Sequence, residues 1–141
     1  MNINNFQIVN YFPGSIGRIT QLHALYYSRH WNFNLKFEAW VGRELSEFLL
    51  RFDSSRDFFK VAVSGEIIIG SIAIDGQEYE TEGARLRWFI TDEEFQGIGV
   101  GKALLSESLS FSRVAGPMFL RGVLMMRRKA ASSSGFASRR K

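Results

Sequence analysis

The sequence predicts a fold of the α/β type, more closely an α+β arrangement with a mixed and mainly antiparallel sheet. Two observations support this prediction. Apolar residues recur at helical spacing in two stretches near the start of the chain, and three β-rich runs then follow one another with no helix between them. A helix-like run and one further strand come next, so the expected element order is β-α-α-β-β-β-α-β.

The first part of the chain predicts one strand and two helices. Residues 6–12 alternate between apolar and polar side chains and end at Pro13 and Gly14, as in a strand closed by a turn. Ser15 is expected to cap the first helix, and a short aromatic stretch at 30–34 separates this helix from the second. The apolar positions of the two helices are Ile16, Ile19, Leu22, Leu25 and Tyr26, and then Phe37, Val41, Leu45, Phe48, Leu49 and Phe52.

The next part of the chain predicts a hairpin with a third strand beside it. Residues 58–63 and 67–74 are apolar runs, and the short polar segment between them makes a tight turn. After an acidic loop, residues 84–91 form another strand-like run and residues 102–109 a helix-like one. Residues 118–126 would supply the last strand of a sheet that is truncated at its C-terminal end.

The chain is expected to form one domain over residues 1–126 and to end in a basic, serine-rich, disordered tail over residues 127–141. It has 141 residues, and 45% of them are hydrophobic. The net charge of +4 arises at the end of the chain: residues 1–113 hold 11 basic and 14 acidic side chains, whereas residues 114–141 hold 7 basic and no acidic ones. The body therefore offers no specific nucleic-acid surface, and the tail could bind RNA or acidic lipid only weakly.

Cysteine is absent from the sequence, which excludes a disulfide framework and a thiolate metal site. The chain opens with no leader-like segment, and no apolar run approaches the roughly 20 residues that a membrane-spanning helix needs. We therefore expect a cytoplasmic protein with no bound metal and no membrane association.

A glycine-rich loop joins the third β-rich run to the helix that follows it. Residues 96–102 read Gln-Gly-Ile-Gly-Val-Gly-Lys. The three alternating glycines leave no side chain in the way of an anion, so successive backbone N–H groups can converge on a phosphate. These groups include the unpaired donors of the helix start, where the helix dipole is positive. A strand, an acidic turn, such a loop and a helix in this order predict a phosphate-binding site.

The loop and the strand order together resemble the GNAT acyltransferase superfamily, whose signature is Gln/Arg-x-x-Gly-x-Gly/Ala. Gln96, Gly99 and Gly101 fit this signature. In that family the loop wraps the pyrophosphate of coenzyme A, and the pantetheine bonds the backbone at the end of the preceding strand. The resemblance implies a coenzyme A site formed by Phe89, Ile90, Thr91, Gln96, Gly97, Ile98, Gly99, Val100, Gly101 and Lys102.

A closer similarity is to the GNAT domains that are fused behind MarR-type regulatory domains. It runs from residue 11 to Gly116 and covers most of the chain. We expect no regulatory domain in front of this chain, and therefore no DNA binding that carries over from these relatives. The shared residues are Pro13, Gly14, Gly17, His23, Tyr26, Trp31, Phe37, Glu38, Phe48, Leu86, Arg87, Phe111 and Arg113.

The similarity ends at Gly116. Relatives continue with an apolar strand, a helix that carries a tyrosine and two last strands, whereas this chain has no tyrosine after Tyr79. In the family that tyrosine commonly protonates the leaving thiolate, so its absence bears on activity. An out-of-frame reading of a gene or a natural truncation would produce such a basic, abrupt end, and the other reading frames of the coding DNA would distinguish the two.

The resemblance implies an N-acetyltransferase that transfers an acetyl group from acetyl-CoA to a primary amine of a small molecule or a protein. A backbone N–H near the end of the strand at 84–91 would polarise the thioester carbonyl. The alternative is a catalytically impaired, truncated GNAT remnant that binds coenzyme A without turnover.

Three side chains could accept a proton from the acceptor amine. Glu38 begins the second helix beside aromatic residues, where partial burial would raise its pKa, although an acidic residue in a first turn also favours the helix dipole. His23 lies on the first helix beside Leu22, and it could instead be a structural histidine bonded to the backbone. Glu82 belongs to an acidic run that could equally be a solvated loop.

Aromatic side chains gather on the two helices that cover the acceptor side in the family. Helical spacing explains most of them as core, and one or two could line a pocket for an amine on an apolar body. They are Tyr26, Tyr27, Trp31, Phe33, Phe37 and Trp40. A sheet that is cut short also leaves an open edge, which predicts a homodimer or a partly molten C-terminal region.

Overall fold

The computed structural model describes residues 5–116 of the chain, and it confirms the predicted α+β fold with an antiparallel sheet and three α-helices. The elements are β1 (Gln7–Val9), α1 (Ser15–Trp31), α2 (Leu35–Leu50), β2 (Phe58–Ser64), β3 (Ile67–Asp75), β4 (Arg85–Thr91), the short 3-10 helix η1 (Glu93–Phe95) and α3 (Val100–Ala115). The strand predicted at 118–126 and the tail predicted at 127–141 lie outside the described residues.

The four strands lie in the sheet in the order in which they occur in the chain, β1-β2-β3-β4, and all three pairings are antiparallel. A two-residue turn joins β2 to β3, with Ser64 paired to Ile67. Gly65 in this turn has a φ of 63°, which a residue with a side chain rarely adopts, so the tight turn predicted from the sequence is confirmed.

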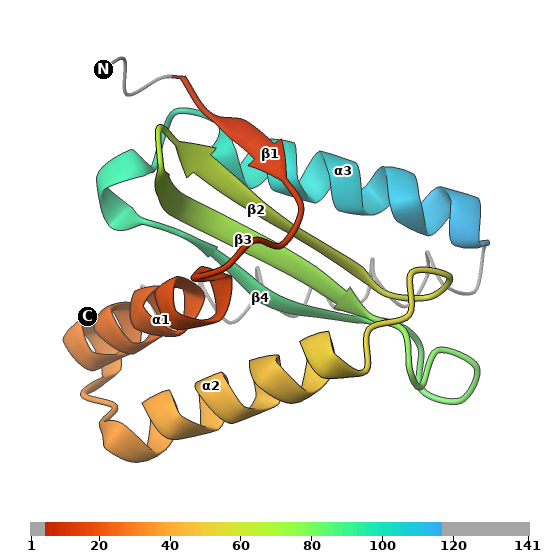
Figure 1. Ribbon diagram of the computed structural model, residues 1–141, viewed down its shortest axis with the longest axis horizontal. Helices are drawn as coiled ribbons and strands as arrows, with labels where there is room; N and C mark the ends of the chain where they lie inside the picture. The colour runs from red at the N-terminus through yellow and green to blue at the C-terminus, as the bar shows by residue number, and fades with distance from the viewer. Residues whose placement is uncertain (1–4, 117–141) are drawn as a thin grey trace.

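Helices cover both faces of the sheet: α1 and α2 pack on one face and α3 on the other (Figure 1). Under α1 and α2 lies a core that includes Ile19, Val41, Leu45, Phe48, Val61 and Trp88. Under α3 lies a second core that includes Ile69, Ile72, Ile74, Val100 and Leu104. The buried strands β2 and β3 contribute to both cores, which explains why their sequences are almost continuously apolar.

The start of α1 differs from the prediction that Ser15 caps it. The N-cap is Gly14, with a left-handed φ of 102°, and no side chain caps the helix. Ser15 is instead the first helical residue: its buried Oγ donates to the Phe12 carbonyl at 2.7 Å and accepts from the Phe12 N–H at 3.2 Å. The hydroxyl therefore closes the turn after β1, and the predicted cap at Ser15 is wrong by one residue.

A short connection turns the chain from α1 into α2. Asn32 ends α1 in the left-handed conformation, with a φ of 59°, and Asn34 caps α2 by accepting the Lys36 N–H on its side chain at 3.3 Å. Asparagine tolerates left-handed backbone better than most residues do, as Asn32 requires, and its side-chain oxygen is a favoured N-cap acceptor, as at Asn34.

Candidate functional site

The glycine loop predicted to hold a phosphate leads directly into α3. Gly97 and Gly99 have left-handed φ angles of 86° and 95°, and Gly99 is the N-cap of α3 with no side-chain cap. The first helical hydrogen bond beyond it runs from the Ala103 N–H to the Gly99 carbonyl at 3.0 Å. The N–H groups at the start of α3 thus have no partner within the helix and lie at the positive end of its dipole.

The space in front of the loop is open. A methyl group added to Gly97 or to Gly99 would meet no atom within 4 Å, whereas one added to Gly101 would lie 3.5 Å from Thr91 Oγ1 and 3.8 Å from the Phe89 ring. The first turn of α3 therefore packs directly on the end of β4. The structure thus places the end of the predicted strand segment 89–91 against the end of the predicted loop 96–102, and within that loop Val100 is buried.

A bulge in β4 lies beside this surface, and the sequence did not predict it. The pairing changes from Ser71 with Ile90 to Ala73 with Arg87, so two residues of β4 face a single residue of β3. Trp88 at the bulge has a φ of 47°, which is rare for a residue with a side chain, and Ser71 Oγ donates to its carbonyl at 2.7 Å.

The outer edge of β4 carries no paired strand among residues 5–116. In general, the backbone groups along such an edge can pair with an extended ligand. The one sequence signal for the bulge is Ser71, a hydroxyl within an otherwise apolar buried strand.

A cavity of about 230 Å³ lies between α1 and the region where β4 passes into η1. Its lining comprises Arg18, Leu22, Leu25, Tyr26, Arg29, Ile90, Thr91, Asp92, Glu93 and Glu94. Arg18 and Asp92 form an ion pair of 2.9 Å at this cavity. The sequence prediction missed both residues, although Arg18 lies four residues before Leu22 and so shares the inner face of α1.

His23 is buried on α1. Its Nδ1 lies 2.8 Å from the Ile19 carbonyl, and because a carbonyl only accepts, this nitrogen carries the proton. Burial lowers the pKa of His23, and the hydrogen bond to Ile19 opposes this shift only in part. The imidazole is therefore neutral near pH 7. This arrangement suits a structural histidine, and a catalytic role for His23 stays a prediction.

The two candidate glutamates lie in different parts of the fold. Glu38 is exposed in the first turn of α2, so its expected partial burial is wrong: the inner face of that helix is formed by residues such as Val41 and Leu45. Glu82 is exposed in the loop before β4. It precedes that seven-residue strand, so it lies on the order of 20 Å from Thr91 at the other end.

The aromatic side chains at the α1–α2 hairpin form a connected row. Ring centroids are 5.8 Å apart between Tyr27 and Phe33, 5.0 Å between Phe33 and Phe37, and 6.3 Å between Phe37 and Trp40. Burial raises the pKa of Tyr27, with a smaller contribution from Tyr26. Phe33 and Trp40 remain about half exposed, at 45% and 46%, so part of the predicted acceptor-side aromatic surface is open to solvent.

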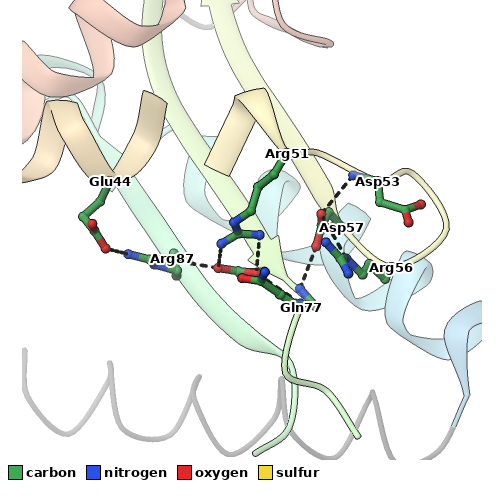
Figure 2. Close-up of polar contacts among 9 residues, drawn as sticks. Glu44, Arg51, Asp53, Arg56, Asp57, Gln77 and Arg87 are labelled. Carbon is green, nitrogen blue, oxygen red and sulfur yellow. Dashed lines mark hydrogen bonds and ion pairs between the residues drawn. The ribbon is translucent and has the colours of Figure 1, made fainter. Parts of the chain in front are cut away.

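The opposite end of the sheet is closed by charged side chains (Figure 2). Asp75 at the end of β3 accepts hydrogen bonds from Arg51 at 2.7 and 3.2 Å and from Arg87 at 3.1 Å. Arg87 also reaches Glu44 on α2 at 3.3 Å, and its guanidinium lies 4.1 Å from the centre of the Trp88 ring. This group of four charged residues ties α2 to the beginning of β4.

The hydrogen bonds around Asp75 hold its carboxylate in the ionised form. Burial alone would raise the pKa of Asp75, but the hydrogen bonds from Arg51, from the Gln77 N–H and from Arg87, together with the positive charge of Arg51, outweigh it and hold the pKa below its usual range. Beside them, the buried Asp57 accepts from the Gly76 N–H at 2.8 Å and the Asp53 N–H at 3.0 Å. Two loops are thereby joined at this end of the sheet.

Comparison with known proteins identifies the class of fold that this loop and sheet define. The family model described as "Acetyltransferase (GNAT) family" matches residues 18–120. This match covers most of the chain, and it contains β4, the glycine loop and α3. The chain belongs to the GNAT acetyltransferase family.

Solved structures show the same fold at low sequence identity. An acetyltransferase from Streptococcus agalactiae 2603 is 18% identical, with a TM-score of 0.64 over 78% of this chain and 67% of its own. PaiA N-acetyltransferase from Thermoplasma acidophilum, solved in complex with coenzyme A, is 16% identical, with a TM-score of 0.59 over 75% and 70%. A predicted acetyltransferase from Clostridium acetobutylicum, solved with acetyl-CoA, is 13% identical, with a TM-score of 0.56 over 77% and 73%.

Matches to curated proteins, membrane-spanning helices and metal sites were also considered. No curated protein matches the chain. Within residues 5–116, no helix is long and apolar enough to cross a membrane, and no group of histidine, aspartate and glutamate side chains is arranged to hold a metal ion. The closer similarity to GNAT domains fused behind MarR-type regulators stays a prediction.

Proposed function

We propose that this chain is a GNAT-type N-acetyltransferase that transfers an acetyl group from acetyl-CoA to a primary amine of a small molecule or a protein. The observation that supports this most is the glycine loop. It combines left-handed backbone at Gly97 and Gly99, open space in front and the start of α3 directly behind. Membership of the GNAT acetyltransferase family also supports this proposal.

The residues present fit coenzyme A. The pyrophosphate carries negative charge, and the start of α3 offers unpaired N–H groups, a positive dipole end and the exposed Lys102 in the first turn. The pantetheine contains amide groups, which suit the outer edge of β4 near residues 89–91, where no strand among residues 5–116 pairs. The cofactor would supply the acetyl group as an activated thioester.

The acceptor amine must lose a proton before it attacks. We keep Glu38 and His23 as candidate bases, because Glu38 is exposed at the aromatic hairpin and His23 is neutral near pH 7. Glu82 is the weakest candidate, since it precedes β4 whereas the glycine loop follows it. The row of aromatic rings from Tyr27 to Trp40 would suit an amine on an apolar body.

Calorimetric titration with acetyl-CoA tests the proposal, with a matched pair of aspartate variants. Gly99→Asp puts a negative charge where the pyrophosphate would lie, and we expect it to weaken binding by at least about tenfold. Gly14→Asp is the control: Gly14 is also a helix N-cap with a left-handed φ and open space, so it carries similar strain and the same charge change away from the loop. It should bind acetyl-CoA like the unaltered protein.

Two results would contradict the proposal. If the unaltered protein takes up no acetyl-CoA, or if both aspartate variants bind equally well, the glycine loop is not the cofactor site. Turnover is measured separately as free thiol released across a panel of amines. Binding without any thiol release would support the impaired remnant in place of the transferase.

A further inference from the structure

We propose that Arg18 and Asp92 form a positioning pair: they hold the segment that leads into the glycine loop, and so they set how tightly the loop binds coenzyme A. The effect on affinity rests on the proposed function, whereas the effect on the position of the segment does not. Neither residue belongs to the glycine-loop motif.

Asp92 joins three parts of the fold directly after β4. Its backbone N–H donates to the Ile69 carbonyl on β3 at 2.7 Å. One carboxylate oxygen, Oδ1, accepts from the Glu94 N–H at 3.0 Å and so caps η1. The other oxygen, Oδ2, accepts from Arg18 on α1 at 2.9 Å. The same residue is thus fixed to the sheet, to the short helix before the loop and to α1.

Arg18 uses all three nitrogens of its guanidinium group. Nε donates to the Ile68 carbonyl at 3.0 Å, Nη1 to Gln21 Oε1 at 2.8 Å and Nη2 to Asp92 Oδ2 at 2.9 Å. The side chains of Arg18 and Asp92 are only 25% and 17% exposed. A partly buried, charge-assisted bond of this geometry is stronger than an ion pair in water, and a lysine could not make all three bonds at once.

The glycine loop depends on its two anchored ends. Gly97 and Gly99 give the loop much backbone freedom. On one side Val100 is buried at the start of α3, and on the other η1 ends at Phe95, whose N–H donates to the Asp92 carbonyl at 2.9 Å. If Asp92 loses Arg18, η1 and the loop sample more conformations. Binding must then restrict them, which lowers affinity.

A second ion pair beside it serves as a matched control. Arg29, also on α1, lies 3.6 Å from Glu93, and the two side chains are 64% and 36% exposed. An exposed pair at this distance contributes little. Arg29→Gln therefore removes the same charge from the same helix, next to the same segment, without breaking a partly buried bond.

The experiment combines amide hydrogen exchange at residues 92–95 in the ligand-free protein with calorimetric titration of coenzyme A. Arg18→Gln and Asp92→Asn should each speed exchange at the Glu94 and Phe95 amides and weaken coenzyme A binding by about tenfold, the expected size for losing one hydrogen bond to a charged group. The double variant should lose less than the sum of the two single variants, because both remove the bond between Arg18 and Asp92. Arg29→Gln should change neither quantity.

The outcomes separate this inference from the proposed function. If the unaltered protein binds coenzyme A and Arg18→Gln matches it in exchange and affinity, the positioning pair is refuted and the proposed function stands. If the unaltered protein does not bind coenzyme A, the proposed function fails, and the exchange data alone decide whether Arg18 positions the segment. Should Arg18→Gln fail to fold, Arg18→Lys takes its place. Arg18→Lys should weaken coenzyme A binding, although less than Asp92→Asn does. If Arg18→Lys matches the unaltered protein in exchange and in affinity, the positioning role of Arg18 and Asp92 is refuted.

Discussion

The two ends of the sheet differ in how their polar groups are satisfied. At the end where β4 passes into the glycine loop, the first N–H groups of α3 have no partner within the helix, and the space beside Gly97 and Gly99 is open. At the other end, the buried side chains of Asp57 and Asp75 are fully engaged by arginines and by backbone N–H groups (Figure 2). We therefore expect stability to be concentrated at one end of the sheet and, under the proposed function, anion binding at the other.

This difference between the two ends reflects the free-energy cost of burying a hydrogen-bond donor that has no partner. Donors left without a partner are tolerated at a surface where water or a ligand can reach them, but they cost about 1–3 kcal/mol each when buried. A binding loop must keep such donors available, so it adds little to the stability of its own region. We therefore expect substitutions at the charged end to change the free energy of unfolding without changing coenzyme A affinity.

Asp75→Ala should strongly destabilise the fold and leave coenzyme A affinity unchanged. Removing the carboxylate leaves Arg87, only 12% exposed, without its closest partner, and breaking a buried ion pair in this way costs about 3–5 kcal/mol. Urea unfolding measures the loss. Glu80→Ala, which removes an exposed charge from the adjacent loop, should cost less than about 0.5 kcal/mol. An equal loss in both variants would contradict the contrast between the ends.

Low pH should destabilise the same end of the sheet by protonating Asp75. The loss of unfolding free energy should be smaller than in Asp75→Ala, because the protonated carboxyl group stays in place. The pKa of Asp75 is held below its usual value in the folded protein, so the carboxylate stabilises the fold above the unfolded pKa of about 3.9. That stability is lost as the pH falls through the folded pKa. Urea unfolding at a series of pH values should show a steeper acid loss in the unaltered protein than in Asp75→Asn, and parallel curves would rule this out.

Two glycines of the loop should respond to alanine with opposite signs. Gly97→Ala forces a side chain into left-handed backbone and should cost about 1–2 kcal/mol. Gly101→Ala lies within α3, where its methyl group makes ordinary contacts with Thr91 and Phe89, and it should stabilise by up to about 1 kcal/mol. Thermal unfolding distinguishes them, and a loss of stability in Gly101→Ala would show that the loop end is more tightly packed than its contacts indicate.

The sequence predicted the features of the site that depend on short stretches of chain. The alternation and helical spacing of apolar residues identified every described strand and α-helix in its correct order, although not the short helix η1, and the three glycines identified the loop before α3. These signals are local, because each depends on neighbours within about one or two helical turns.

The features that the sequence did not predict depend on residues far apart in the chain. Arg18 meets Asp92 across 74 positions, and the bulge at Trp88 is visible only once β4 is paired with β3. Glu38 was expected to be partly buried because aromatic residues adjoin it in sequence, yet one step along a helix turns a side chain by about 100° and takes it off the inner face.

The order of strands in the sheet also has a consequence for how the protein folds. The β2–β3 hairpin closes through a two-residue turn, whereas β1 can pair with β2 only after the whole α1–α2 hairpin has been looped out, as Val9 pairs with Val61. Closing a longer loop costs more chain entropy, and only three residue pairs of β1 repay it. We therefore expect the sheet to nucleate at the β2–β3 hairpin and grow outward, with β1 joining last.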